Sequence, residues 1–131
     1  MRIVTLPKGK RFYRGGGRRT RGLLWLTTSV EVALSFGDPW EFTLTRAVRM
    51  ARFDGRNAHF ELARFVGVAP DDDNLHQAAK AFCSMQGFDG WHLPSFYGPA
   101  ASDTLLCDAN AAVPSGPLSD AVIDAALRRA T

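Results

Sequence analysis

The feature that most limits how this chain can fold is the shortness of its apolar segments. The longest uncharged apolar run, residues 22–30, is far shorter than the ~20 residues that a membrane-spanning helix needs. Residues 23–28 are apolar and β-prone, which predicts a buried strand. Residues 40–45 and 47–53 alternate with period two, which predicts strands with one buried face. The chain must therefore build its core from many short elements.

Short helices are predicted between the strands, in no regular order. Ser29 suits the N-cap of a helix over residues 30–36, and Gly37 suits its C-terminal end. Further helices are expected over 59–68 and 75–85, and further strands over 10–14, 91–93 and 104–108. Short strands and helices in mixed order favour an α+β domain over a doubly wound parallel sheet.

A single domain, a short linker and a final helix form the expected organisation. The chain has 131 residues, of which 46% are hydrophobic, and this is enough for one domain with a proper core. Residues 114–117 are rich in proline and glycine, so we expect a domain over 1–113, a linker over 114–118 and a helix over 119–131. Ser119 would cap this helix, whose apolar stripe must pack on the domain or on a protein partner.

The sequence gives little support to metal or disulfide chemistry. Cys83 and Cys107 lie in apolar surroundings outside any CxxC motif, so we expect two buried, reduced thiols. His59, His76 and His92 lack ligand spacing, so no metal site is expected. The first residues contain no apolar segment long enough for a signal peptide. We therefore expect a cytoplasmic protein without membrane contact, or one exported by a route that leaves no such mark.

Basic residues are concentrated near the N-terminus. Residues 1–30 hold eight of the sixteen Lys and Arg residues and none of the thirteen acidic residues. This asymmetry indicates an anionic partner, either a phosphate-bearing ligand or a nucleic acid. Arg18, Arg19 and Arg21 form a cluster beside a run of three glycines. The alternative interpretation is a solvated basic loop.

Five short motifs follow one another in an order that is more informative than any one of them. A strand ends in Tyr-Arg-Gly at 13–15, the next ends in Trp-Leu-Thr-Thr-Ser at 25–29, and a helix continues to Phe-Gly at 36–37. A Gly-Phe-Asp-Gly turn at 87–90 precedes a last strand that opens with Ser-Asp at 102–103. This order resembles small ADP-ribosyltransferase-like domains of the arginine–serine–glutamate type.

The resemblance covers about residues 6–113 and implies a compact, split β-sheet core with short helices, with NAD+ as the substrate. Arg14 would then contact the phosphates or ribose of the dinucleotide, because a guanidinium offers bidentate, permanently charged contacts to phosphate oxygens. Tyr13 belongs to the same motif, and Gly15 would let the ligand approach the backbone. The alternative for Arg14 is one more exposed arginine in a basic stretch.

Hydroxyl and aromatic side chains complete the nicotinamide pocket that the resemblance implies. Thr27, Thr28 and Ser29 match the motif whose hydroxyls shape this pocket and orient the catalytic acid. Threonine also suits strands, and Ser29 also suits a helix N-cap. Phe36 matches the helix aromatic on which a nicotinamide stacks, with core packing as the alternative.

The catalytic acid is the point at which the chain departs from the family. The matching position holds Asp103, one methylene shorter than the family's glutamate, whose carboxylate supports the oxocarbenium-like transition state as nicotinamide leaves. A misplacement of ~1 Å can lower a rate ~100-fold, so activity requires the backbone to compensate. His92 and Tyr97 are expected near the cleft as hydrogen-bond donors, and Trp25 and Trp91 in the core.

Three functions are compatible with these features. The first is an NAD-dependent mono-ADP-ribosyltransferase, or an NAD glycohydrolase, with Arg14, Ser29 and Asp103 as its catalytic residues. It would act on a protein or nucleic acid as a bacterial toxin, an effector or a phage protein in a host cytoplasm. The second is a binding module that keeps the fold without catalysis. The third is a structural component of a larger assembly, docked through the C-terminal helix.

Overall fold

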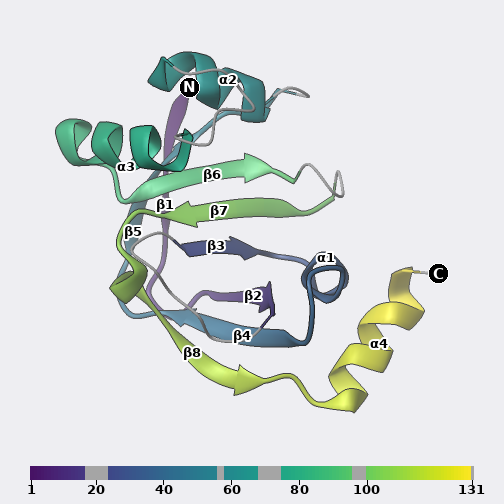
Figure 1. Cartoon of the computed structure of the whole chain (residues 1–131). Helices are drawn as coiled ribbons and strands as arrows, with labels where there is room; N and C mark the ends of the chain where they lie inside the picture. The colour runs from purple at the N-terminus through teal and green to yellow at the C-terminus, as the bar shows by residue number, and fades with distance from the viewer. Residues whose placement is uncertain (17–23, 56–57, 68–74, 96–99, 131) are drawn as a thin grey trace.

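The computed structural model describes residues 1–16, 24–55, 58–67, 75–95 and 100–130. Within these residues the short segments of the sequence form eight strands and four α-helices, so the prediction of a mixed α+β chain is confirmed (Figure 1). In chain order the elements are β1 (Arg2–Leu6), β2 (Arg11–Gly15), β3 (Leu24–Thr27), α1 (Val30–Leu34), β4 (Pro39–Leu44), β5 (Val48–Arg52), α2 (Ala58–Val66), α3 (Leu75–Gln86), β6 (Gly90–Pro94), β7 (Ser102–Leu106), the 3-10 turn η1 (Ala109–Ala111), β8 (Ala112–Pro117) and α4 (Asp120–Ala130).

One sheet contains all these strands, but its two parts are barely joined. The strand order is β1-β5-β6-β7-β3-β2-β4-β8, and each neighbouring pair is antiparallel except β5 and β6. β2 pairs with β4 along its whole length, whereas within the described residues the pairing of β2 with β3 consists of Tyr13 and Thr27. We call β1, β5, β6, β7 and β3 the five-strand part, β2, β4 and β8 the three-strand part, and the weak junction between them the split.

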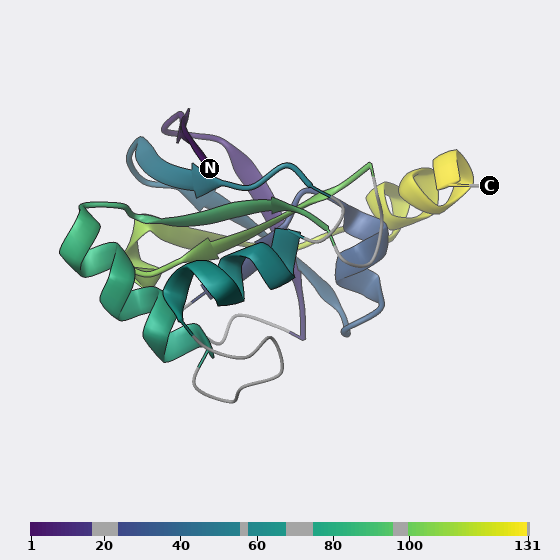
Figure 2. The same ribbon diagram turned by 90° about the horizontal axis from the view of Figure 1, so that it is seen from above.

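Two hydrophobic cores lie on opposite faces of the sheet, because successive side chains of a strand point to opposite sides. The first core draws on both parts of the sheet, and its buried members are Leu6, Phe12, Leu24, Leu26, Phe42, Leu44, Val48, Met50, Leu106, Ala111 and Ala112. The second core is covered by α2 and α3, which lie on one side of β6 and β7 (Figure 2). Its buried members are Ala51, Phe53, Ala58, Leu62, Cys83, Trp91, Leu93 and Leu105.

Aromatic packing and one close backbone contact fix the five-strand part. The fully buried ring of Trp91 stacks on Phe53 at a centroid distance of 5.8 Å and meets Phe65 edge-on at 5.9 Å. The expectation that Trp91 belongs to the core is therefore confirmed. At the preceding residue, Gly90, a Cβ would overlap the carbonyl oxygen of Leu105 in β7. Only glycine lets β6 and β7 approach each other at this point.

The predicted linker over 114–118 is wrong for most of its length, because residues 114–117 belong to β8. β8 pairs with β4, with Pro114 opposite Phe42 and an irregularity between Glu41 and Phe42. Proline lacks the N–H that a central strand must donate, but an edge strand has a partner on one side only. Proline and glycine therefore mark an edge strand here rather than a connection between two units.

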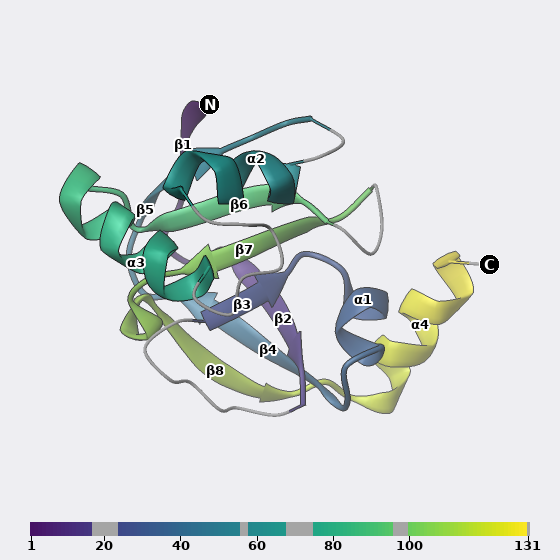
Figure 3. The same cartoon turned by 45° about the horizontal axis from the view of Figure 1, so that its top comes forward.

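The two ends of the chain are also defined by the structure. β1, which no local pattern predicts, pairs antiparallel with β5 along its whole length. At the other end, the Ser119 hydroxyl accepts the N–H of Val122 at 3.3 Å, so the predicted cap of the last helix is confirmed. α4 lies beside α1, on the side of the molecule away from α2 and α3 (Figure 3).

The cysteines are free thiols, as predicted, although Cys107 is only half-buried. The contact of Cys83 with Cys107, together with burial, raises the pKa of Cys83 far above its usual value. None of the described helices is long and apolar enough to cross a membrane.

Candidate functional site

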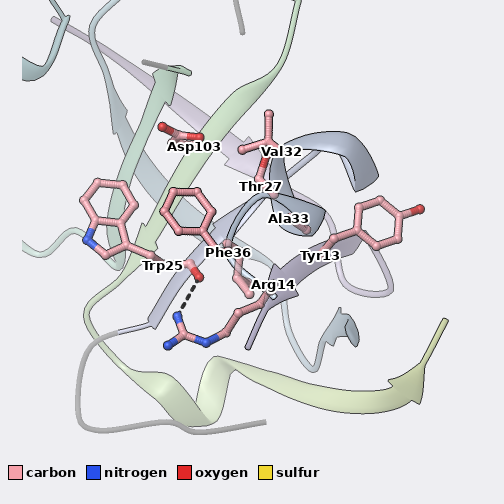
Figure 4. Close-up of a pocket in the computed structure, with 10 residues that line it drawn as sticks. Tyr13, Arg14, Trp25, Thr27, Val32, Ala33, Phe36 and Asp103 are labelled. Atoms are coloured by element: carbon pink, nitrogen blue, oxygen red, sulfur yellow. Dashed lines mark hydrogen bonds between the residues drawn. The ribbon is translucent and has the colours of Figure 1, made fainter. Parts of the chain in front are cut away.

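A pocket of about 540 Å³ lies at the split, where β2 and β3 diverge beside α1 (Figure 4). Its size is ordinary for a small-molecule site, since such pockets measure roughly 300 to 1,000 Å³. It is lined by Tyr13, Arg14, Gly15, Trp25, Leu26, Thr27, Val32, Ala33, Phe36 and Asp103. Six of these lining residues are ones that the resemblance assigns to the NAD+ site: Tyr13, Arg14, Gly15, Thr27, Phe36 and Asp103.

Arg14 bridges the gap between β2 and β3. In the described residues these two strands share one backbone pair, between Tyr13 and Thr27. Beyond it, Nη1 of Arg14 donates a hydrogen bond to the carbonyl oxygen of Trp25 at 3.1 Å. The side chain thus satisfies a carbonyl group that a continuous sheet would pair through the backbone. Part of the role of Arg14 is therefore to hold the two strands together where they diverge.

The guanidinium of Arg14 still has unused hydrogen-bonding capacity. Its Nε atom is buried and has no hydrogen-bond partner in the part of the chain that the structure describes. Burial lowers the pKa of Arg14, but arginine stays protonated at any physiological pH. A permanent positive charge with an unpaired donor at a pocket is suited to the oxygens of a phosphate or carboxylate.

Gly15 is required by packing. A Cβ at this position would overlap the carbonyl oxygen of Ala33 and lie 2.9 Å from the Cβ of Phe36. The helix α1 therefore rests directly on the backbone of β2, and the pocket keeps its shape only while this residue is glycine. The expected approach of a ligand to Gly15 stays a prediction.

The hydroxyl groups at the end of β3 serve different purposes. Thr27 lines the pocket, and its Oγ1 accepts the N–H of Ser29 at 3.1 Å. Oγ1 of Thr28 accepts the N–H of Ser102 at 2.9 Å, which ties β3 to the start of β7. The Ser29 hydroxyl accepts the N–H of Val32 at 3.2 Å and so caps α1, as predicted. Thr28 and Ser29 do not belong to the pocket lining, so of these three residues Thr27 is the one that the structure brings to the pocket.

Two aromatic side chains contribute to the apolar wall. α1 ends at Leu34, and Phe36 follows in the next turn with 56% of its surface exposed, so the alternative of core packing is wrong for Phe36. Trp25 is only half-buried; it packs against the second core and also lines the pocket, so its expected place in the core holds in part. Exposed aromatic surface beside a charged group offers a place for a flat ring to stack.

Asp103 places a carboxylate in a central strand with only 7% of its surface exposed. It lies opposite Thr27 of β3, and Thr27 lies opposite Tyr13 of β2, so these three residues form a row across three adjacent strands. Figure 4 shows the Tyr13 ring pointing away from the other labelled side chains, and Phe36 between Asp103 and Arg14 in this view. An acidic residue this deeply buried is rare unless it has a partner or a function.

Comparison with known proteins does not identify a family. No protein-family model matches the chain, and no curated protein is significantly similar to it. The indications of function therefore lie in the residues of the pocket.

Other residues singled out in the sequence lie away from the pocket. Asp89, in the turn before β6, accepts the N–H of Arg49 at 2.7 Å and a guanidinium N–H of Arg46 at 3.1 Å. These bonds hold the turn against β5, which accounts for the aspartate in that motif. His92 does not line the pocket, and its Nδ1 lies 2.7 Å from Oγ1 of Thr104.

Some of the predictions fall outside the described residues. These are Tyr97 and the arginine cluster Arg18, Arg19 and Arg21. Among the residues that the structure does describe, no group of His, Cys, Asp and Glu side chains is arranged to hold a metal ion.

The described pocket therefore combines four chemical groups: a guanidinium, a buried carboxylate, a threonine hydroxyl and aromatic surface. The guanidinium can hold a phosphate, and the aromatic side chains can hold a flat ring. The carboxylate can stabilise a positive charge that develops nearby. Such a set suits a ligand that carries both a phosphate and a ring.

Proposed function

We propose that the pocket at the split binds NAD+ and that the protein is an NAD-dependent mono-ADP-ribosyltransferase, or an NAD glycohydrolase where water is the acceptor. The observation that carries this proposal is that Arg14, Thr27, Phe36 and Asp103 come from four separate segments and line one pocket. The motif order that resembles ADP-ribosyltransferase-like domains assigns all four to the dinucleotide site. The proposed acceptor is a protein or a nucleic acid, and the proposed setting is that of a toxin, an effector or a phage protein.

The charge of Arg14 supports the binding of the dinucleotide. NAD+ carries two phosphate groups, and a guanidinium contributes charge-assisted hydrogen bonds that are about twice as strong as neutral ones. Because Nη1 is already bonded to Trp25, the guanidinium is held in one orientation, which reduces the entropy lost when a ligand binds.

The aromatic wall supports the placement of the nicotinamide ring. Phe36 and Trp25 line the pocket, and Phe36 has enough exposed surface to stack on a ring. The side chain of Thr27 lies in the row that leads from β2 to Asp103, so its methyl and hydroxyl groups border the space next to the carboxylate.

Asp103 would act on the bond that is broken. The C1′–N bond between ribose and nicotinamide cleaves, its electron pair leaves with the now neutral nicotinamide, and C1′ becomes positively charged. The nucleophile of the acceptor, or water, then bonds to C1′ and loses a proton. A carboxylate near C1′ lowers the energy of this cation-like transition state. Because aspartate is shorter than glutamate, we expect slow turnover.

Release of nicotinamide from NAD+ by the purified protein tests this proposal. We expect release by the wild type and its loss in Asp103→Asn and in Arg14→Gln. Asp124→Asn is a matched control, because Asp124 is an exposed acid on α4, away from the pocket. Equal rates in wild type and in folded Asp103→Asn would remove Asp103 from the mechanism. If the wild type releases no nicotinamide and millimolar NAD+ does not raise its melting temperature, the NAD+ proposal is wrong.

A binding module without catalysis is the second candidate. The observations that favour it are the short side chain of Asp103 and the use of the Ser29 hydroxyl as a helix cap instead of as a pocket group. A melting temperature raised by NAD+ equally in wild type and Asp103→Asn, with no nicotinamide released, would distinguish it from the enzyme.

A structural role through α4 is the third candidate. Val122 and Leu127 in α4 are each 43% exposed, so the apolar stripe predicted there is only partly covered. Replacing both with Asp would change the oligomeric state, measured by sedimentation, if α4 joins copies of the chain, and would leave a monomer unchanged.

A further inference from the structure

A row of basic side chains crosses the five-strand part on the face opposite to Asp103. Arg2 in β1 lies opposite Arg52 in β5, Arg52 lies opposite His92 in β6, and His92 lies opposite Thr104 in β7. Residues paired in register point to the same face, whereas the successive residues Asp103 and Thr104 point to opposite faces. We call Arg2, Arg52 and His92 the cationic row; its strands are neighbours in Figure 1.

One carboxylate serves both arginines of the row. Asp54 accepts a hydrogen bond from Nε of Arg2 at 2.7 Å and from Nε of Arg52 at 2.6 Å. These two bonds hold the pKa of Asp54 far below its usual range. Arg52 also donates to the Ser102 hydroxyl at 3.4 Å, so its guanidinium is fixed against β7 with 17% of the side chain exposed.

His92 is the neutral member of the row. Its Nδ1 is hydrogen-bonded to Oγ1 of Thr104 at 2.7 Å. Burial lowers the pKa of His92 to about 4, and three nearby cations contribute in the same direction: Arg52, Lys10 and Arg2. The effect of Lys10 means that its ammonium group also lies near the row, although Lys10 comes from the turn before β2.

The positive charge of Arg2 and Arg52 does not stabilise the pairing of β1 with β5. Like charges directly opposite each other on neighbouring strands are destabilising, and Arg2 and Arg52 are such a pair. In the described residues, Asp54 is the acid that forms ion pairs with them. Lys10 adds a third cation, whose ammonium lies over the ring of Phe12 at 5.6 Å from its centroid. Concentrated charge of one sign at a surface attracts ligands of the opposite sign.

We propose that the cationic row binds the phosphate backbone of a nucleic-acid strand. Neighbouring strands are ~4.8 Å apart, so the charged side chains of Arg2 and Arg52 start about one strand spacing apart, and the ammonium of Lys10 adds charge beside the neutral His92. Of the two lysines in the turn between β1 and β2, Lys10 is the one whose charge acts on His92. The proposal does not depend on the reaction at the pocket, because the row and Asp103 occupy opposite faces of the sheet.

Fluorescence anisotropy with a short fluorescein-labelled oligothymidylate tests the proposal over a range of salt concentrations. Each phosphate contact to a single strand contributes about 0.7 to the fall of the logarithm of the association constant per decade of salt. The double variant Arg2→Gln, Lys10→Gln should lower this slope by about 1.4 and weaken binding roughly 20-fold at 0.1 M salt. The single variant Lys10→Gln, which leaves Asp54 paired with both arginines, should lower the slope by about 0.7.

The matched control is Arg64→Gln, Arg129→Gln. It replaces two exposed arginines away from the row, one on α2 and one on α4. It has the same net charge as the double variant, and the proposal expects it to bind like the wild type. An equal loss of oligonucleotide affinity in the control and in the double variant would show that net charge alone governs binding, and would overturn the proposal. So would the absence of binding by the wild type at low salt. Binding to vesicles with an anionic phospholipid, but not to the oligonucleotide, would overturn it as well.

Discussion

Under α2 and α3 the large side chains of the sheet are buried against one another, whereas at the split large and charged side chains surround an open pocket. Trp91 is fully buried and stacks on Phe53. Phe36 has 56% of its surface exposed, and Arg14 keeps a buried Nε without a partner in the described residues. The first region is closed by aromatic packing, whereas the second combines exposed aromatic surface with a buried charge.

The contrast between the two regions separates motif residues that the fold requires from motif residues that line the pocket. Gly15 and Gly90 are required because a Cβ at either position would overlap a neighbouring carbonyl oxygen. Asp89 is required because it accepts the N–H of Arg49 in the turn before β6. Phe36 is largely exposed, Asp103 is an acid buried in a central strand, and both line the pocket. Residues that break local rules in this way are good candidates for function.

Replacing one aromatic residue in each region gives the largest contrast. Trp91→Ala should lower the free energy of unfolding by about 4 kcal/mol, because it empties a buried site. Phe36→Ala should change it by no more than about 0.5 kcal/mol, since Phe36 is largely exposed. The same Phe36→Ala variant should bind NAD+ about 10-fold more weakly. Urea denaturation and calorimetry measure both quantities, and a large stability loss in Phe36→Ala would break the contrast.

The two glycines sharpen the comparison. Gly90→Ala pushes a methyl group into the backbone of a continuous sheet, so we expect a loss of about 3 kcal/mol in unfolding free energy. Gly15→Ala pushes a methyl group against α1, a helix of only five residues that can shift. We therefore expect a smaller loss in unfolding free energy, of about 2 kcal/mol. Because α1 shapes the pocket, NAD+ binding should be lost in folded Gly15→Ala. Unchanged NAD+ affinity in this variant would place the ligand elsewhere.

Charge at the split is tested by two arginines of the same strand. Arg14→Gln should weaken NAD+ binding by at least about 10-fold, because a charge-assisted hydrogen bond is lost. Arg11→Gln is the control: Arg11 is exposed, does not line the pocket and forms only a long 3.7 Å ion pair with Glu41. Titration calorimetry with NAD+ compares them. Similar affinities in the two variants would show that Arg14 serves only to bridge β2 and β3.

The smallest expected effect concerns His92 in the five-strand part. Its pKa is about 4 in the folded protein against the usual 6.5, so the unfolded chain binds the extra proton between these values. Stability is therefore full above pH 6.5 and falls as the pH drops toward 4. Allowing for partial exposure, we expect a loss of about 1 kcal/mol between pH 7 and pH 5. His92→Gln should remove this loss in urea denaturation; Asp54 does not interfere, because its lowered pKa makes it titrate in more acidic solution.

Local patterns in the sequence predict most elements of this fold for physical reasons. Period-two alternation marks β4 and β5, and the hydroxyls of Ser29 and Ser119 mark helix starts that the structure confirms. β8 escapes prediction because Pro114 and Gly116 are typical of linkers, and only the strand order shows that this segment is a sheet edge. The cationic row also escapes prediction, since Arg2, Arg52 and His92 are aligned by strand pairing across the sheet.

The candidate site was predictable where a motif supplies several residues in one strand. Tyr13, Arg14 and Gly15 are adjacent in β2, so a single motif brings all three to the pocket lining. Ser29 shows the limit of this reasoning, because its hydroxyl can cap a helix or face a pocket and only the structure shows that it caps α1. Trp25 both packs against the second core and lines the pocket. Its position depends on how β2 and β3 diverge, which no local pattern in the sequence encodes.

The rate of nicotinamide release from NAD+ in wild type, Asp103→Asn and Asp103→Glu tests the central claim most directly. If the carboxylate of Asp103 supports the leaving of nicotinamide, Asp103→Asn should release none. Asp103→Glu, which restores the longer reach, should be faster than the wild type by as much as ~100-fold. Circular dichroism should show that both variants are folded. Release by folded Asp103→Asn at the wild-type rate would contradict the claim that the pocket at the split is an NAD+-cleaving site.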